Sequence, residues 1–183
     1  MIKLNAGQLR KQSEKFIDHK ESVARNDIYI ILDNVLDTYN IGSVFRLADA
    51  VAAKKVILCA GSVTPPNPRI HKASINTSEW VPWQYFETTK EAIESLRKEV
   101  PGIQIVAVEL DKRAVPYDQF EYKLPIALLV GHETDGVSQE IMDLCDAVVE
   151  LPMFGVNISL NVMVSLSIAI YEVIEKTIST ARQ

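Results

Sequence analysis

Ile28-Tyr29-Ile30-Ile31-Leu32 is an uninterrupted apolar run, and polar Asp33 and Asn34 follow it directly. Such a run is typical of a parallel strand that is covered on both faces of its sheet. A helical pattern of apolar residues then extends from about Ile41 to Val51. The segment therefore predicts a strand, a loop and a helix, which is the repeating unit of an open α/β sheet.

The rest of the chain continues this alternation. We expect further strands at 56–60, 103–108, 126–130 and 147–151, and further helices at 90–100, 138–145 and 162–178. Alternating elements of this kind form a mostly parallel sheet with helices on both faces. A chain of 183 residues, of which 48% are hydrophobic, suits one such unit. We therefore expect a single domain over residues 1–183, in which residues 1–27 are a short N-terminal helical extension.

The composition argues against two classes of protein. No apolar run reaches the roughly 18 to 20 residues of a membrane-spanning helix, and the N-terminus lacks the apolar region of a signal peptide. The net charge of −5 argues against a protein that holds nucleic acid by overall positive charge. We expect a cytoplasmic protein that does not contact a membrane.

Positive charge is nevertheless concentrated locally. No carboxylate occurs between Val51 and Ser78, and three prolines in this stretch indicate a stiff loop. A basic stretch of this kind could bind phosphates, and its basic residues are Lys54, Lys55, Arg69 and Lys72. A solvent-exposed loop without any ligand would explain the same charges.

Glycine is scarce and is concentrated in three blocks. Four of the seven glycines lie in Asn40–Arg46, Gly131–Gly136 and Pro152–Asn161. Glycine is used where the backbone takes a positive φ or where another group approaches it closely, so the blocks are candidate ligand-binding turns. Each block follows a predicted strand, and ligands of open α/β sheets bind beyond the carboxyl ends of strands. We therefore expect the three blocks to meet in one site.

The first block carries a cation in an otherwise apolar helix start. We expect Arg46 to be buried and to bind an anion, because an unpaired buried charge is costly. Its planar guanidinium suits a phosphate or a carboxylate. The structural alternative is an ion pair with Asp33 or Asp49, and the structural alternative for Asn40 is a helix N-cap.

The second block, Gly131-His132-Glu133-Thr134-Asp135-Gly136, matches neither the Walker sequence nor the Gly-x-Gly-x-x-Gly fingerprint. An ordinary dinucleotide site is therefore disfavoured. A turn between two glycines could present backbone amides to a ligand while Glu133 orients Asn40 or Arg46. His132 is a weaker candidate for a general base, since the sequence shows no partner for it.

The third block leads into a helix, predicted from Val162, that is apolar on nearly every side. Such a helix must be buried by the core or by a second subunit. Its beginning offers free N–H groups to an anion. Capping would explain Ser159 or Asn161 singly, but not their pairing with Pro152-Met153-Phe154-Gly155.

Together the blocks resemble the three motifs, in order, of the SpoU/TrmH branch of the SPOUT RNA methyltransferases. The resemblance covers roughly Ile28 to Glu172. It rests on Asn40-x-Gly42-x-x-x-Arg46, Gly131-x-Glu133-x-x-Gly136 and Leu151-Pro152-Met153-x-Gly155 with Ser159-Leu160-Asn161-Val162. It implies the SPOUT fold with a deep C-terminal trefoil knot, S-adenosylmethionine as the cofactor, no metal, and a homodimer whose interface builds the active site.

The resemblance also implies roles for single residues. Arg46 would be the catalytic arginine that helps to remove the proton of a ribose 2′-hydroxyl, and Asn40 would support it. Glu133, Ser159 and Asn161 would surround the reaction centre. The cofactor would be bound by Gly131, Leu151, Met153, Gly155 and Leu160, and RNA by Lys54, Lys55, Arg69 and Lys72.

Three questions stay open at this point. A guanidinium is a poor base, so either Arg46 has unusual surroundings or a substrate phosphate accepts the proton. Transfer RNA is favoured over ribosomal RNA because the chain is compact, and an unpaired nucleotide is favoured because its 2′-hydroxyl is easier to align. A non-catalytic knotted-fold RNA-binding protein and a flavodoxin-like nucleotide-binding protein are the alternatives. The intact Arg46, Glu133 and Asn161 argue against the first, and the apolar helix argues against the second.

Overall fold

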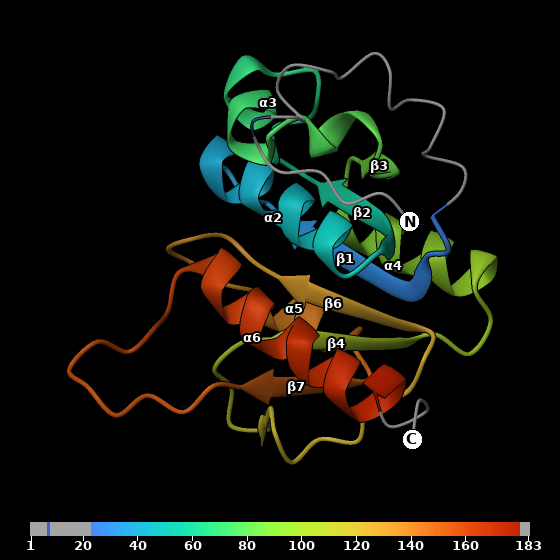
Figure 1. The fold of residues 1–183 in the computed structure, drawn as a ribbon. Coiled ribbons are helices and arrows are strands. Elements are labelled where there is room, and N and C mark those ends of the chain that lie inside the picture. The colour runs from blue at the N-terminus through green and yellow to red at the C-terminus, as the bar shows by residue number, and fades with distance from the viewer. Residues whose placement is uncertain (1–6, 8–22, 180–183) are drawn as a thin grey trace.

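The computed structural model describes residue 7 and residues 23–179, and within them the chain forms one parallel sheet (Figure 1). Its seven strands lie in the order β3-β2-β1-β6-β4-β7-β5, and every pair is parallel. The strands are Asn26–Asp33 (β1), Ala53–Cys59 (β2), Trp83–Phe86 (β3), Gln104–Val108 (β4), Val115–Pro116 (β5), Ile126–Val130 (β6) and Ala147–Glu150 (β7). The predicted parallel α/β sheet is confirmed.

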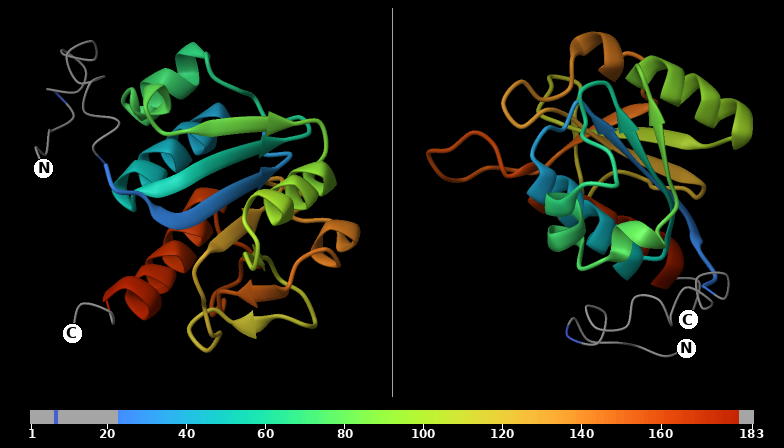
Figure 2. Two further views of the ribbon diagram at one scale, coloured as in Figure 1. Left: turned by 90° about the vertical axis from the view of Figure 1, so that its right-hand side faces the viewer. Right: turned by 90° about the horizontal axis from the view of Figure 1, so that it is seen from above.

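Helices cover both faces of this sheet (Figure 2). They are Thr38–Ala50 (α2), Pro68–Ser74 (α3), Thr89–Glu99 (α4), Gln139–Met142 (α5) and Val162–Ile174 (α6), and a π-helical turn, Glu175–Ser179, continues α6. Side chains alternate between the two faces of a strand, so β1 contributes to both cores. Ile28 and Ile30 pack with α2, α3 and α6, whereas Tyr29 and Ile31 pack with α4 and α5.

The stretch 51–78 is more ordered than the stiff loop that its prolines suggested. It contains β2, α3 and a 3-10 turn at Thr77–Glu79. Pro68 stands in the first turn of α3, where a missing N–H costs nothing. The side chain of Asn67 caps this helix by accepting hydrogen bonds from the backbone N–H groups of Arg69 and Ile70. The predicted loop is therefore confirmed for residues 61–67, and the prediction was wrong for α3.

Short elements account for the other differences. The edge strands β3 and β5 were not predicted, and the helix expected at 138–145 is only the four residues of α5. The helical extension expected at 1–27 lies largely outside the described residues, and its last two residues, Asn26 and Asp27, belong to β1. In the described part of the chain, no helix has both the length and the apolar character needed to span a membrane.

The position of β1 in the sheet creates the place for a site. β1 and β6 are neighbours, and the chain leaves β1 toward β2 but leaves β6 toward β7, which lies nearer the opposite edge of the sheet. Such a switch point opens a crevice at the carboxyl ends of the two central strands. Leu32 of β1 is paired with Val130 of β6, so both strands end at the same level. The loops after β1 and β6 therefore face each other across this crevice.

Candidate active site

The first block lies inside α2, and its asparagine does not cap the helix. Asp37 is the N-cap, and its Oδ1 accepts a hydrogen bond from the backbone N–H of Tyr39 at 2.7 Å. Asn40 lies in the first turn and is only 9% exposed. The capping alternative for Asn40 is thus excluded, and its side chain is free to bind other segments.

Asn40 connects all three blocks. Its Nδ2 donates to Oε1 of Glu133 at 3.1 Å, and its Oδ1 accepts a hydrogen bond from Nδ2 of Asn161 at 3.1 Å. The Oδ1 of Asn161 caps α6 by accepting hydrogen bonds from the N–H groups of Met163 and Val164. An amide side chain donates and accepts at once, so asparagine can make both contacts. We call this the Asn40–Glu133–Asn161 network.

Glu133 fastens the loop after β6 to the loop after β1. Its Oε1 accepts a hydrogen bond from the backbone N–H of Asp37 at 2.9 Å, and its Oε2 accepts one from Leu36 at 3.2 Å. Partial burial acts to raise the pKa of Glu133, but the hydrogen bonds from Asp37, Asn40 and Leu36 outweigh it and lower the pKa. Glu133 is therefore an ionised carboxylate, and the expectation that it orients Asn40 is confirmed.

Two glycines allow the second block to close on itself. The backbones of His132 and Gly136 exchange hydrogen bonds of 3.1 and 2.9 Å. A Cβ at Gly131 would lie 2.3 Å from the carbonyl of Gly136, which itself has a φ of +66°. His132 Nδ1 accepts from the N–H groups of Thr134 and Asp135, both at 3.2 Å. Nδ1 also lies 3.4 Å from an Asp135 carboxylate oxygen. His132 therefore shapes the turn.

A cavity of about 310 Å³ opens beside this turn, at the carboxyl ends of β4, β6 and β7. Predicted residues from the second and third blocks line it together: Gly131, Glu133, Leu151, Met153, Ser159 and Leu160. Gly155 lies instead in the exposed part of the loop 152–161, and no atom would lie within 4 Å of a Cβ built on it. The structure thus brings the predicted cofactor residues together, with Gly155 as the exception.

One wall of the cavity was not predicted. Glu109, the first residue after β4, accepts hydrogen bonds from the N–H groups of Leu110 and Val137, each at 2.9 Å. Both Glu109 and Leu110 line the cavity. Ligands bind beyond the carboxyl ends of parallel strands, and a strand was predicted at 103–108. The sequence therefore did indicate Glu109 as a candidate site residue, because it follows this strand directly.

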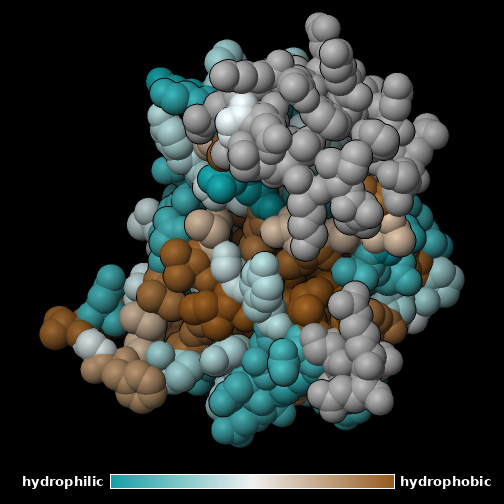
Figure 3. Space-filling model, in the orientation of Figure 1, coloured by the Kyte–Doolittle hydropathy of each residue, from teal (hydrophilic) through white to brown (hydrophobic). Residues whose placement is uncertain are grey.

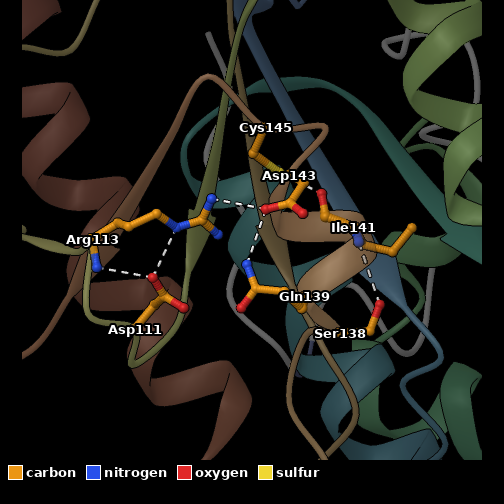
Figure 4. A network of polar contacts seen from close by, with 7 residues as sticks. All are labelled: Asp111, Arg113, Ser138, Gln139, Ile141, Asp143 and Cys145. Carbon is orange, nitrogen blue, oxygen red and sulfur yellow. Dashed lines mark hydrogen bonds and ion pairs between the residues drawn. The ribbon is translucent and has the colours of Figure 1, made fainter.

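An ionic network follows this wall in the sequence, and Figure 4 shows its side chains. The Arg113 guanidinium contacts Asp111 at 3.0 Å and Asp143 at 2.8 Å, which links the segment after β4 to the end of α5. Gln139 also donates to Asp143 at 2.9 Å. Hydrogen bonds from the backbone and side chain of Arg113 lower the pKa of Asp111, and those from Gln139 and Arg113 lower the pKa of Asp143. The network therefore favours ionised carboxylates.

Arg46 is exposed, so the expectation of a buried cation was wrong. The buried face of α2 includes Ile41, Val44, Phe45 and Ala48, and the 3.6-residue period turns Arg46 away from these residues. Among the described residues, Arg46 has no hydrogen bond or ion pair. The alternative ion pairs are not formed either, because Asp33 binds the Thr89 hydroxyl and Asp49 accepts a hydrogen bond from Trp80 Nε1.

The four predicted phosphate-binding residues fall into two groups. Lys54 and Lys55 lie at the amino end of β2, away from the crevice, and pair with Asp27 at 3.2 Å and Glu99 at 2.8 Å. Arg69 and Lys72 lie on α3 and are exposed. Arg69 lines a second cavity of about 900 Å³, which is more open than the first. Of the four residues, only Arg69 lines a cavity at the crevice.

The chain belongs to the SpoU rRNA methylase family, because its residues 27–171 match the model of that family. It is 31% identical over 151 residues to the tRNA (guanosine(18)-2′-O)-methyltransferase of Aquifex aeolicus, covering 81% of this chain and 69% of that protein. It is 28% identical over 160 residues to a putative TrmH family tRNA/rRNA methyltransferase, YacO, of Bacillus subtilis, covering 86% of this chain. The chain spans 63% of the length of the Bacillus protein, which is less than two thirds.

Solved structures show the same fold. The SpoU methyltransferase AviRb of Streptomyces viridochromogenes superposes with a TM-score of 0.76 at 27% identity, covering 89% of this chain and 65% of that one. An AdoMet-bound rRNA methyltransferase of Sinorhizobium meliloti superposes with a TM-score of 0.75 at 27% identity, covering 85% and 59%. Family membership and these superpositions exclude the flavodoxin-like alternative.

Proposed function

We propose that the chain is an S-adenosylmethionine-dependent RNA methyltransferase that acts on a ribose 2′-hydroxyl. The observation that carries the proposal is the Asn40–Glu133–Asn161 network, which joins the three blocks beside the 310 Å³ cavity. The name of the Aquifex relative states this chemistry for that protein. The family membership of the chain supports extending it to this one.

The smaller cavity suits S-adenosylmethionine. Leu151, Met153 and Leu160 offer apolar surface for the adenine, and the missing side chain at Gly131 leaves backbone accessible to a ligand. The carboxylates of Glu109, Glu133 and Asp135 favour a ligand of net positive charge. When bound, the cofactor supplies a methyl group on a sulfonium, whose departing sulfur is a good leaving group. The Sinorhizobium structure was determined with this cofactor bound.

The chain itself has to position the hydroxyl and provide a route for its proton. Arg46 is exposed and unpaired among the described residues, so its guanidinium is available to an RNA phosphate or to the reacting oxygen. A guanidinium is a poor base, so we assign the proton to a substrate phosphate and to Arg46 the stabilisation of the developing negative charge. Asn40, Glu133 and Asn161 are positioning residues, and Ser159 lies at the cavity rim. No metal is needed for these steps.

Transfer RNA in the cytoplasm is the proposed substrate. Two named relatives are described as tRNA or tRNA/rRNA methyltransferases, whereas the Sinorhizobium protein is described as an rRNA methyltransferase. In this chain, the feature that supports RNA binding is the exposed basic side of α3, whose Arg69 lines the larger cavity. Separate assays on tRNA and rRNA distinguish these substrates.

A homodimer completes the proposal. The outer face of α6 leaves Val164 39% and Tyr171 54% exposed, and the loop 152–161 leaves Phe154 94% and Ile158 76% exposed. Figure 3 shows apolar surface over α6 and at the tip of this loop. A helix that is apolar on most sides needs a cover, and a second copy of the chain would provide one. We also propose the trefoil knot of the SPOUT fold, to be traced in an experimental electron-density map.

Transfer of labelled methyl groups tests the proposal. Wild type, Arg46→Ala and the control Lys98→Ala, an exposed cation on α4, would each be incubated with tRNA and, separately, with rRNA lacking ribose methylation. We expect alkali-resistant labelled dinucleotides from tRNA with wild type and the control, and their loss with Arg46→Ala. Cofactor binding and RNA binding without transfer to either pool would favour the non-catalytic RNA-binding alternative. Absent cofactor binding would overturn the methyltransferase proposal.

A further inference from the structure

The 900 Å³ cavity is a groove that shares a wall with the smaller cavity. His132, Glu133 and Thr134 line both, so the second block separates the two spaces. The opposite side of the groove is formed by the start of α2 and the start of α3, which contribute Tyr39 and Arg69. A ligand in the groove would therefore lie directly beside a ligand in the smaller cavity.

We propose that this groove holds the target nucleotide of the RNA in an unpaired state, with Tyr39 stacking on its base and Arg69 binding an adjacent phosphate. The inference rests on the proposed function for the nature of the substrate. It adds the place where the nucleotide binds and two residues that recognise it.

Tyr39 has the properties of a stacking surface. It is 56% exposed although it is a large aromatic residue within a well-formed helix. Its backbone N–H is held by the side chain of Asp37, so the start of the side chain is fixed while the ring remains accessible. Apolar side chains extend the surface: Leu36, Val63 and Pro68 also line the groove. Every base has a π-face, so an aromatic ring binds unpaired bases with little sequence preference.

Tyr39 also lies on the side of α2 that carries Arg46. The two residues are seven positions apart, which is close to two helical turns, so their side chains point in similar directions. Both are exposed. A nucleotide stacked on Tyr39 would thus extend its sugar and phosphate along the surface on which Arg46 stands.

Arg69 provides the matching charge. It is exposed in the first turn of α3, and its guanidinium has no hydrogen bond or ion pair among the described residues. Lys54, Lys55 and Arg113, by contrast, are already paired with carboxylates. The carboxylate of Glu133 in the same groove is occupied by three donors. Arg69 is therefore available for a charge-assisted contact with a phosphate.

Binding of a short, unstructured, fluorescein-labelled RNA oligonucleotide tests the inference without requiring catalysis. We expect Tyr39→Ala to raise its Kd about five- to hundredfold, as loss of one stacking contact does, and Tyr39→Phe to keep the Kd within about twofold. We expect Arg69→Gln to lower the slope of log Kd against log salt by about 0.7, which reports one lost phosphate contact. Lys98→Gln, on the opposite face of the sheet, should change neither quantity.

Two results would overturn the inference. One is a Tyr39→Ala protein that binds the oligonucleotide as wild type does, and the other is equal weakening for the oligonucleotide and for the same sequence annealed to its complement. Circular dichroism and the Kd for S-adenosylmethionine show whether each variant is folded. If the wild-type protein binds the oligonucleotide through Tyr39 and Arg69 but transfers no methyl group, the proposed function fails while the inference about the groove stands.

Discussion

Asn40 shows how one buried side chain can connect three segments that are far apart in the sequence. Its amide lies between a carboxylate that only accepts and an amide that also caps α6. Neither aspartate nor leucine could satisfy both neighbours, because one lacks a donor and the other lacks any polar atom. The residue is buried, so a lost hydrogen bond there would not be replaced easily by water.

Substitution of Asn40 tests this role. Asn40→Ala leaves Glu133 with one donor fewer and Asn161 Nδ2 unpaired, so we expect about 1–3 kcal/mol less stability in urea unfolding. The loops would also shift, and we expect methyl transfer to fall about a hundredfold. The double variant with Asn161→Ala should lose clearly less than the sum of the single losses. Additive losses would show that the two side chains act independently.

The pKa of Glu133 predicts a pH dependence of stability. Because its folded-state pKa is lowered, Glu133 contributes stability that is present above its unfolded value of about 4.3 and is lost as the pH falls through the folded value. We expect Glu133→Gln to be less stable than wild type at pH 7, and the difference to shrink as the pH falls below about 4.3. Urea unfolding at several pH values measures this. Glu94→Gln, exposed on α4, should show no such convergence.

At the scale of elements, close packing of α2 on α3 explains Gly42. A Cβ at this position would lie 2.5 Å from Cβ of Ala73 and 2.9 Å from the carbonyl oxygen of Ile70. The glycine therefore lets two helices approach, and its interpretation as part of a ligand-binding turn was wrong. The contact still serves the site, because it places α3, and with it Arg69, beside the start of α2.

Gly42→Ala and Gly155→Ala form a matched pair. In an isolated helix the first change would stabilise by about 1 kcal/mol, but here the helices must separate. We expect Gly42→Ala to destabilise by about 1–3 kcal/mol in thermal unfolding. Gly155→Ala meets no neighbour and has no positive φ, so it should stay within about 0.5 kcal/mol and keep cofactor affinity. A stabilised Gly42→Ala protein would contradict the packing argument.

Arg113 links the segment after β4 to the end of α5, and its loss should weaken ligand binding in the smaller cavity. Arg113→Ala removes contacts to Asp111 and Asp143, so the wall at Glu109 and Leu110 would become more mobile. Arg113 and Asp143 are exposed, and Asp111 is partly buried. Ion pairs at the surface contribute little, so we expect only about a two- to fivefold rise in the Kd for S-adenosylmethionine, measured by calorimetry. The neighbouring Lys112→Ala is the control. An equal effect of both variants would point to charge rather than to the link.

At the scale of the whole molecule, the apolar outer face of α6 predicts self-association. Val164→Glu places a charge at the centre of the proposed interface, so we expect sedimentation analysis to show a dimer for wild type and a monomer for the variant. Lys98→Glu alters charge on α4 and should leave the dimer intact. A monomeric wild type would remove the basis for the dimer.

The local sequence was sufficient for the alternation of strands and helices. Long buried strands such as β1 and β6 are apolar throughout, so their pattern is visible without any partner. The edge strands β3 and β5 escaped notice because they are short and largely exposed, and the burial pattern that would mark them is weak. Pro68 was assigned to a loop because proline is common in loops, although it is also common in the first turn of a helix, where it lies here.

The sequence alone determined the parallel α/β class, the three blocks at strand ends and, through their resemblance to known motifs, the family. Only the tertiary structure decided that Arg46 is exposed, that Lys54 and Lys55 lie away from the crevice, and that Glu109 forms a cavity wall. The physical reason is that the types and spacing of residues show which segments form strands or helices. Which side chains meet depends on strand order and helix packing, which bring together residues that are far apart in the chain.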